Sequence, residues 1–333
     1  MKDYFEYWLL RAAYGFLAVL PRPWAIAVGA AFGHLVYWLA WPLRTIALGH
    51  LALAFPQRTP KEHRAILQAC ARNLGRMAAE VAHFHKLNRE NVGDYVRIDE
   101  PALWREVVAR QDGRGLIVLT AHFGNWELLA YFHGLMGVPV TLIHRPMRNK
   151  LVNDWLVRLR GRAGTRSIEK KAAAREALRI LREGGILAIP ADQNQRYSFG
   201  VFVDFFGIPA CTTTGPVRLA QHSGARIVPV FLRRVGESSK HVVEVWPPVE
   251  LVETGDPQAD LVENTQRCSR ILEEMIRRYP EQWIWFHRRW KTRPPMEQSQ
   301  QWTPTQAPGA NVHAQNRSRE TTTDDVVANR VVV

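Results

Sequence analysis

The chain has 333 residues, of which 47% are hydrophobic and 23% charged, so it can bury a core, and disorder of the whole chain is excluded. A mean hydropathy of -0.22 excludes a polytopic membrane protein, because most of the chain must face water. The 44 Lys and Arg residues against 31 Asp and Glu residues give a net charge of +13, which favours an anionic partner such as nucleic acid, an acidic membrane surface or a phosphorylated substrate.

The first expected elements are hydrophobic helices. Residues 24–43 contain no Asp, Glu, Lys or Arg, and a Pro-Arg-Pro sequence separates them from a second apolar stretch at 12–20. Twenty apolar residues in a helix can cross a hydrocarbon core of about 30 Å. We therefore predict an N-terminal membrane anchor over residues 1–45, either spanning the bilayer or lying in one leaflet as a hairpin or amphipathic segment. A buried helix of the globular core is the alternative.

The body of the chain alternates between helical and strand patterns. Apolar residues recur at helical spacing from 61 to 90, and short, nearly continuous apolar segments follow. This alternation predicts an α/β domain over residues 46–293, with a mixed, largely parallel central sheet flanked by helices. Strands are expected at 96–98, 115–121, 138–143, 186–189, 226–232 and 242–246, and further helices at 125–135, 149–163, 170–183, 214–223 and 259–279.

The composition changes at residue 294. The segment 294–333 is rich in Gln, Thr, Pro and Asn and has little to bury, so we predict a disordered tail there. Its three Arg residues are outnumbered by four acidic residues. The positive charge therefore belongs to the folded body.

One constellation suggests catalysis. His122 directly follows the expected strand 115–121, and Glu127 lies five residues further on. On one helix that spacing is a rotation of about 140°, but a turn at Gly124-Asn125 allows the two side chains to converge. A carboxylate that orients an imidazole is the usual arrangement of a general base, and α/β sheets bind ligands at the carboxyl ends of strands. A capping or core histidine is the alternative.

The same spacing also occurs between His85 and Glu90. That copy lies in a polar stretch at a helix end, with no strand before it. We expect it on a solvated surface, so the context of His122 rather than the spacing is what favours a functional role.

The segment TAHFGNWE around His122 resembles the His-x4-Asp/Glu motif of glycerolipid-type acyltransferases, and in detail the lipid A biosynthesis (lauroyl/myristoyl) acyltransferase family of Gram-negative bacteria. Four further segments are similar to blocks of that family, in order, so that the resemblance extends from about residue 45 to 294. They are IHRPMRNKLVNDWLVRLRGRAG with Arg145, GILAIPADQNQ with Asp192 and Gln193, VFVDFFGIPACTTTGPVRLA, and WIWFHRRWKTRP.

The resemblance implies transfer of an acyl chain from a thioester, usually on acyl carrier protein, to a hydroxyl of a phosphorylated glycolipid. It also implies a bacterial inner-membrane enzyme whose catalytic domain faces the cytoplasm. His122 would be the general base, oriented by Glu127. The oxyanion would be stabilised by Arg145 or by backbone N–H groups near Gly124 and Asn125, and Arg145 could instead bind a substrate phosphate.

Asp192 also ends an expected strand, so it and Gln193 are expected at the same cleft, where we predict that they bind substrate together with Asn125 and Arg145. Asp192 would hold either Arg145 or the turn that contains His122; a helix-capping or turn aspartate is the alternative.

The remaining expectations concern cofactors and partners. We expect no metal or other cofactor, because the sequence has no HExxH motif or carboxylate cluster. The basic segment 287–293 suits a phosphate-rich lipid surface or an acidic carrier protein, and no nucleic acid is expected. Two alternatives stay open: acylation of another glycolipid or a lysophospholipid, and, in a different class, a non-catalytic basic protein that binds membrane surfaces or nucleic acid.

Overall fold

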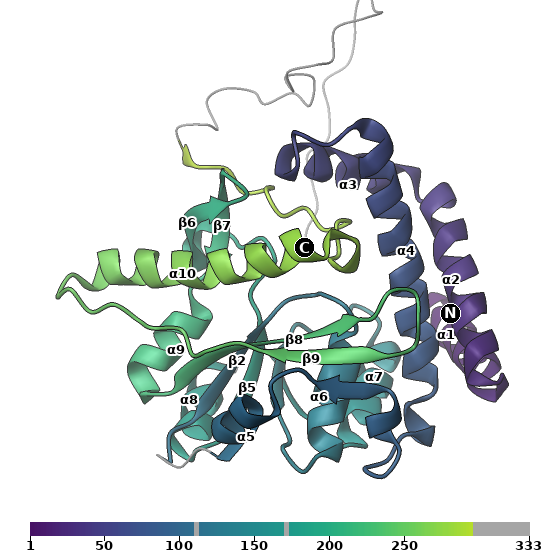
Figure 1. Cartoon of the computed structure of the whole chain (residues 1–333), viewed down its shortest axis with the longest axis horizontal. Helices are drawn as coiled ribbons and strands as arrows, with labels where there is room; N and C mark the ends of the chain where they lie inside the picture. The colour runs from purple at the N-terminus through teal and green to yellow at the C-terminus, as the bar shows by residue number, and fades with distance from the viewer. Residues whose placement is uncertain (110–112, 170–172, 296–333) are drawn as a thin grey trace, which may run out of the picture.

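The computed structural model describes residues 1–109, 113–169 and 173–295, so the predicted tail lies outside the described residues except for its first two positions. Helices and strands alternate after an all-helical N-terminal part (Figure 1). The helices are α1 (Lys2–Val19), α2 (Arg22–Leu39), α3 (Trp41–Ala54), α4 (Pro60–Ala82), α5 (Pro101–Ala109), α6 (Trp126–Leu135), α7 (Lys150–Gly161), α8 (Ala173–Arg182), α9 (Gly215–Ser223) and α10 (Pro257–Arg278). The strands are β1 (Val96–Ile98), β2 (Leu116–Thr120), β3 (Thr141–His144), β4 (Arg166–Glu169), β5 (Ile186–Pro190), β6 (Gly200–Phe205), β7 (Ile208–Thr213), β8 (Arg226–Arg234) and β9 (His241–Val245).

Seven strands form one sheet in the order β1-β9-β8-β2-β5-β3-β4. All neighbours in it are parallel except β8 and β9, which are antiparallel. The predicted mixed, largely parallel sheet is therefore confirmed. The predicted site residues follow its strands β2, β3 and β5 along the chain.

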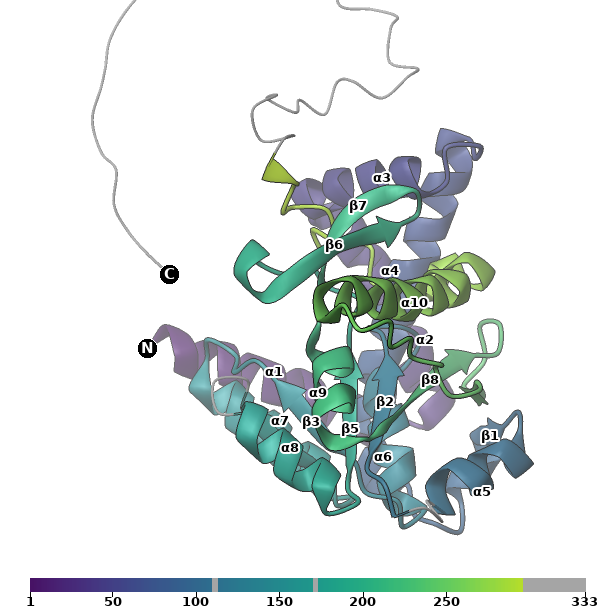
Figure 2. The ribbon, with the colours of Figure 1, turned by 90° about the vertical axis from the view of Figure 1, so that its left-hand side faces the viewer.

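Helices cover both faces of this sheet. In β2, Ile117 and Leu119 belong to a core shared with α8, α9 and α10, whereas Leu116 and Val118 belong to a second core with α6. This alternation follows from the two-residue period of side chains along a strand. Figure 1 shows α10 above the sheet and α6 below it, and Figure 2 shows the molecule from the side.

Three features were not predicted from the sequence: α5, the edge strand β4, and the antiparallel hairpin of β6 and β7. β4 reads Arg-Ser-Ile-Glu, and an edge strand at the surface does not need a continuous apolar run. The hairpin strands pair with each other, outside the central sheet. Of the predicted helix 170–183, residues 170–172 lie outside the described residues, and the rest contains all of α8.

The prediction of one helix over residues 24–43 was wrong. α2 ends at Leu39 and α3 begins at Trp41, with an angle of 91° between the two helices and a proline in the first turn of α3. In the described part of the chain, no single helix combines the length and the apolarity that a membrane crossing needs; α2 and α3 reach them only as this bent pair. The predicted domain boundary at residue 45 falls inside α3.

One face of α2 is buried against α4 through glycines. A Cβ atom added to Gly75 of α4 would lie 1.9 Å from the carbonyl oxygen of Gly29 in α2, and one added to Gly33 would lie 2.1 Å from the carbonyl oxygen of Ala71. The two backbones therefore touch. The alternative of a buried core helix is correct for this face, while the opposite face of α2 is exposed.

Gly75→Ala is expected to destabilise the protein by about 1–3 kcal/mol, because the added methyl group must push α2 away from α4. Gly49→Ala is the matched control: Gly49 lies inside α3 with nothing within 4 Å of an added Cβ. That change is expected to stabilise the helix by roughly 0.5–1 kcal/mol. Urea denaturation of both variants measures the difference, and equal effects would contradict the close packing.

Candidate active site

The loop after β2 places His122 at the carboxyl end of the sheet. All five residues of β2 are buried, so the strand is fixed in the core up to Thr120. The turn that follows requires a glycine: Gly124 has a φ of +57°, and a Cβ atom there would lie 1.8 Å from the carbonyl oxygen of Leu232. Asn125 then caps α6 by accepting a hydrogen bond from the Leu128 N–H, so the turn into α6 predicted from the sequence is confirmed.

The carboxylate that binds His122 is Asp192, which follows β5. His122 Nδ1 lies 2.9 Å from Asp192 Oδ1, and the His122 backbone N–H donates to Asp192 Oδ2 at 3.1 Å. The indole N–H of Trp283 donates to the same oxygen at 2.8 Å. Asp192 is fully buried. Of the two contacts predicted for Asp192, the one with the His122 turn is therefore present.

This pair shifts both pKa values. Burial favours the neutral imidazole, but the charge and hydrogen bond of Asp192 outweigh it, so the pKa of His122 is raised above 6.5. The charge of Glu127 has a smaller effect in the same direction. Burial likewise favours the protonated carboxyl group, but His122 and Trp283 hold the pKa of Asp192 at about 2. Asp192 is thus ionised and keeps the Nδ1 proton on His122, which leaves Nε2 as the basic nitrogen.

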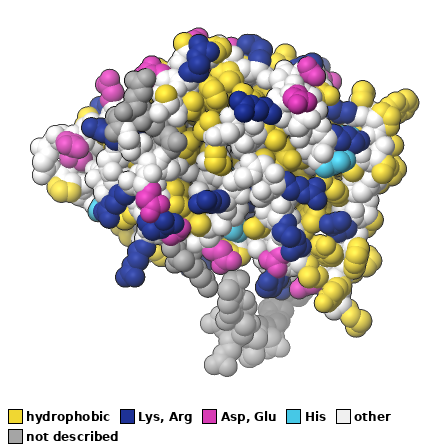
Figure 3. All heavy atoms as spheres, turned by 90° about the horizontal axis from the view of Figure 1, so that it is seen from below, with side chains coloured by type: hydrophobic (Ala, Val, Ile, Leu, Met, Phe, Trp, Pro, Cys, Tyr) yellow, Lys and Arg dark blue, Asp and Glu magenta, His cyan; other side chains and the backbone are white. Residues whose placement is uncertain are grey.

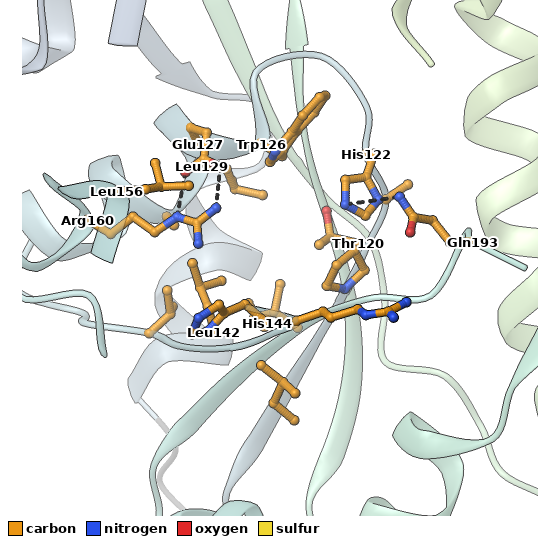
Figure 4. Close-up of a pocket in the computed structure, with 18 of the residues that line it drawn as sticks. Thr120, His122, Trp126, Glu127, Leu129, Leu142, His144, Leu156, Arg160 and Gln193 are labelled. Carbon is orange, nitrogen blue, oxygen red and sulfur yellow. Dashed lines mark hydrogen bonds and ion pairs between the residues drawn. The ribbon is translucent and has the colours of Figure 1, made fainter. Parts of the chain in front are cut away.

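Glu127 does not orient His122, and that part of the prediction was wrong. Its carboxylate is held by Arg160 of α7, whose Nε and Nη2 lie 2.8 and 2.5 Å from the two carboxylate oxygens. This bidentate pair lies on the opposite side of the cavity from His122 (Figure 4). As the second residue of α6, Glu127 is directed toward α7, whereas Asp192 comes from the neighbouring strand β5 and reaches the imidazole.

Asn125, predicted to bind substrate, is a buried structural residue. Its side-chain N–H donates to Glu80 Oε2 at 2.8 Å, and it is not among the residues that line the cavity. Glu80 forms a buried ion pair with both terminal nitrogens of Arg234, at 2.6 and 2.7 Å. His241 Nε2 lies 3.4 Å from the same carboxylate. This cluster connects α4, β8 and β9 to the first turn of α6.

The two backbone N–H groups of this turn that were predicted as oxyanion donors already form hydrogen bonds within the protein. The Gly124 N–H donates to the Gln282 carbonyl at 2.8 Å, and the Asn125 N–H donates to the Leu232 carbonyl at 3.3 Å. Both groups hold the turn in place against the C-terminal segment and β8. An oxyanion at His122 must therefore be stabilised by other groups.

A cavity of about 420 Å³ opens at His122, a volume typical of small-ligand sites. Gln193 lies at His122, with its side-chain nitrogen 3.5 Å from His122 Nε2 (Figure 4). Arg145, which follows β3, lines the cavity and is exposed, so it lies at the entrance. The structure thus brings His122, Glu127, Arg145 and Gln193 to one cavity, with Asp192 behind His122.

The inner wall of the cavity is apolar. The strand register places Val118, Ala188 and Leu142 side by side across β2, β5 and β3, two residues before the ends of these strands. Helices α6 and α7 close the cavity from the other side. The apolar residues that line the cavity on these two sides include Val118, Leu129, Ala130, Val140, Leu142, Leu156, Val157 and Ala188. A polar rim above an apolar interior suits a long apolar chain with a reactive polar end.

Two residues of the site, Arg160 and Trp283, were not predicted from the sequence. Arg160 lies in a predicted helix, but no pattern pairs it with Glu127. Trp283 belongs to the WIWFHRRW segment. Nothing in that segment indicates that the Trp283 indole binds Asp192. Within that segment Arg289 is almost fully buried and donates to the Cys211 carbonyl and to Thr212 Oγ1, so its charge does not face a lipid surface or a carrier protein.

The comparison histidine behaves as predicted. His85 is exposed, and its Nδ1 contacts the Ala82 carbonyl at 2.9 Å. Glu90 is exposed as well. The same five-residue spacing therefore gives a solvated surface in one case and a cavity wall in the other.

Glu80→Ala is expected to lower the free energy of unfolding by about 3–5 kcal/mol, because Arg234 would stay buried without a counter-charge. Urea denaturation checks this. Glu176→Ala, which removes an exposed partner of Arg179, is the matched control and should leave stability nearly unchanged. A small effect of Glu80→Ala would show that the buried pair is not essential to the fold.

Comparison with known proteins relates the chain to one family of enzymes. Residues 1–292 match the sequence model of the bacterial lipid A biosynthesis acyltransferases. The chain is 27% identical over 293 residues to the lipid A biosynthesis lauroyltransferase of Escherichia coli K12, covering 87% of this chain and 93% of that protein. It is 30% identical over 302 residues to the palmitoleoyltransferase (88% and 94%) and 25% identical over 295 residues to the myristoyltransferase (88% and 89%) of the same bacterium.

Proposed function

Because the chain belongs to the bacterial lipid A biosynthesis acyltransferase family, we propose that it transfers a fatty acyl chain from acyl carrier protein to a hydroxyl or hydroxyacyl group of a phosphorylated lipid A precursor. The single observation that supports this most is the geometry of His122. Its Nδ1 is bound to a buried carboxylate, and its ring borders a cavity with an apolar interior. A base next to a site for an apolar chain is what acyl transfer to a hydroxyl requires.

In this mechanism His122 Nε2 removes the proton from the acceptor hydroxyl, and the ionised Asp192 stabilises the imidazolium that forms. The alkoxide attacks the thioester carbonyl and gives a tetrahedral oxyanion. When the oxyanion collapses, the C–S bond breaks, and the thiolate takes up the proton from His122. The products are the new ester and the free thiol of the carrier. No covalent acyl-enzyme is needed.

The oxyanion needs donors that are fixed in advance. Gln193 is the best placed of them, because its side-chain amide already lies 3.5 Å from His122 Nε2. Arg160 also lines the cavity and is held in one orientation by Glu127. We assign Glu127 the role of positioning Arg160, and Arg145 at the entrance that of binding a phosphate of the acceptor or an acidic group of the carrier protein.

The acyl chain would occupy the apolar interior between the sheet, α6 and α7. One methylene group adds only about 0.8 kcal/mol of burial, so the choice of chain length depends on the exact shape of this interior. The three relatives from one bacterium, named for lauroyl, palmitoleoyl and myristoyl transfer, agree with such a dependence.

We further propose that the protein attaches to the cytoplasmic face of the inner membrane through an apolar N-terminal surface. Most of the large hydrophobic side chains that are exposed belong to the first 43 residues. In Figure 3 hydrophobic side chains gather at the right-hand edge, where α1 and α2 lie. An exposed patch of this kind is typical of a membrane-contacting surface. Its members are Tyr4, Phe5, Trp8, Leu9, Leu10, Phe16, Val19, Trp24, Val28, Phe32, Leu35, Val36, Trp38, Leu39, Trp41 and Leu43.

This surface adjoins the cavity through α7. Tyr14 of α1 packs edge-on against Trp155 of α7, with ring centroids 5.0 Å apart, and the Asn149 side chain donates to the Asp3 carbonyl at 2.8 Å. The residues after Trp155 in α7 include Leu156, Val157 and Arg160, which line the cavity. A lipid acceptor held in the membrane would therefore be close to His122.

The test uses purified full-length protein, an acyl carrier protein loaded with a radiolabelled fatty acid, and a lipid A precursor in detergent micelles. Label is expected to move to the precursor. Label on an added lysophospholipid in place of the precursor would identify another acceptor, and transfer to neither lipid would overturn the proposed function.

A further inference from the structure

A second cavity, separate from the one at His122, lies at the bend between α2 and α3. Its volume is about 390 Å³, and we call it the bend cavity. Aromatic and basic side chains dominate its lining, and none of the lining residues is acidic. The ones used below are Tyr37, Trp38, Trp41, Arg44 and Arg64.

The positive charges of this cavity have no anionic partner among the residues that the structure describes. Arg44 lies over the rings of Tyr37 and Trp38, 5.3 and 5.4 Å from their centroids, which fixes its guanidinium at the aromatic wall. Neither Arg44 nor Arg64 of α4 forms an ion pair with any residue in the described ranges. Two unpaired guanidinium groups on one cavity favour an anionic ligand with several oxygens, such as a phosphate.

The cavity lies where the apolar N-terminal surface meets polar surface. Trp38 and Trp41 line it and are 56% and 66% exposed, and the exposed apolar side chains of α2 continue from them. On the other side, Arg64 is exposed on the first half of α4. Tryptophan and arginine side by side at such a boundary match the level of lipid headgroups in a bilayer.

We propose that the bend cavity binds the phosphate of an anionic phospholipid headgroup. Arg44 and Arg64 pair with the phosphate oxygens, while Trp38 and Trp41 pack against the glycerol and the first methylenes of the chains. This site rests on the proposed membrane attachment. It does not depend on acyl transfer, because neither arginine lines the cavity at His122.

The experiment measures binding of the full chain to vesicles of phosphatidylcholine alone and of phosphatidylcholine with phosphatidylglycerol, by sedimentation. The double variant Arg44→Gln/Arg64→Gln is expected to lose roughly tenfold or more of its partitioning onto the anionic vesicles, and little on the neutral ones. The matched control is Arg89→Gln/Arg105→Gln, which removes two exposed charges outside the cavity and should retain most of the anionic preference. Circular dichroism verifies that both variants fold.

Equal losses in the two double variants would overturn the site, because they would show only the general attraction of a protein with a charge of +13. Displacement from anionic vesicles by inorganic phosphate, at an ionic strength matched with chloride, would assign the cavity to a soluble phosphate and also overturn the lipid proposal. Acyl transfer in detergent micelles should be unchanged in Arg44→Gln/Arg64→Gln. If the protein transfers no acyl chain at all, the vesicle result is still informative, so the two proposals fail separately.

Discussion

His122→Ala is expected to lower kcat/KM for acyl transfer by roughly 10²–10⁴-fold, the usual contribution of a positioned general base. The reason is that no other base in the described residues is held in the same way, with Nδ1 on a buried carboxylate and the ring at the cavity. The initial rate of label transfer from the acyl carrier protein to the lipid A precursor measures the loss.

His85→Ala is the matched control for this change. His85 has an acidic residue at the same spacing, but it is exposed and lies outside the cavity. This variant should transfer acyl chains at the rate of the parent. A His122→Ala protein that folds and still transfers at the parent rate would remove His122 from the mechanism.

Asp192→Asn is expected to cost roughly 10²–10⁴-fold in kcat with little change in KM, because the amide no longer keeps the Nδ1 proton on His122 or stabilises the imidazolium. The variant keeps the size of the side chain, so the fold should persist. The measurement is steady-state kinetics with both substrates varied.

Asp99→Asn serves as its control, since Asp99 is exposed and pairs with the exposed Arg97. It should have no effect on turnover. If Asp192→Asn instead raised KM and left kcat unchanged, Asp192 would bind substrate rather than orient the base.

The general form of the fold could be read from the sequence because the buried strands have a strong pattern. The segment GLIVLTA is apolar at nearly every position, as expected for a central parallel strand, and it forms β2. The strand β4 has no such pattern, and the helix break at residue 40 was hidden inside twenty apolar residues. The packing of α2 on α4 through glycines was hidden as well, because it is a contact between segments far apart in the sequence.

The site was predictable only in part, for a similar reason. The ends of β2 and β5 meet because adjacent parallel strands end on the same side of a sheet, which explains why both His122 and Asp192 were identified. The sequence did not reveal which carboxylate binds the imidazole. Glu127 is nearer in the chain, but as the second residue of α6 it is directed to Arg160, and Asn125 is used entirely in holding that helix.

The pH dependence of kcat/KM tests the pairing of His122 with Asp192 most directly. A base acts in its neutral form, so the rate of the parent should rise with pH through an ionisation above 6.5, because the pKa of His122 is raised. In Asp192→Asn the pKa of His122 is set only by burial and by smaller charges, so this ionisation should move to lower pH. The shift should be larger than the shift in Glu127→Gln. If Glu127→Gln moves it more, or Asp192→Asn leaves it in place, the assignment of Asp192 as the partner of the base is contradicted.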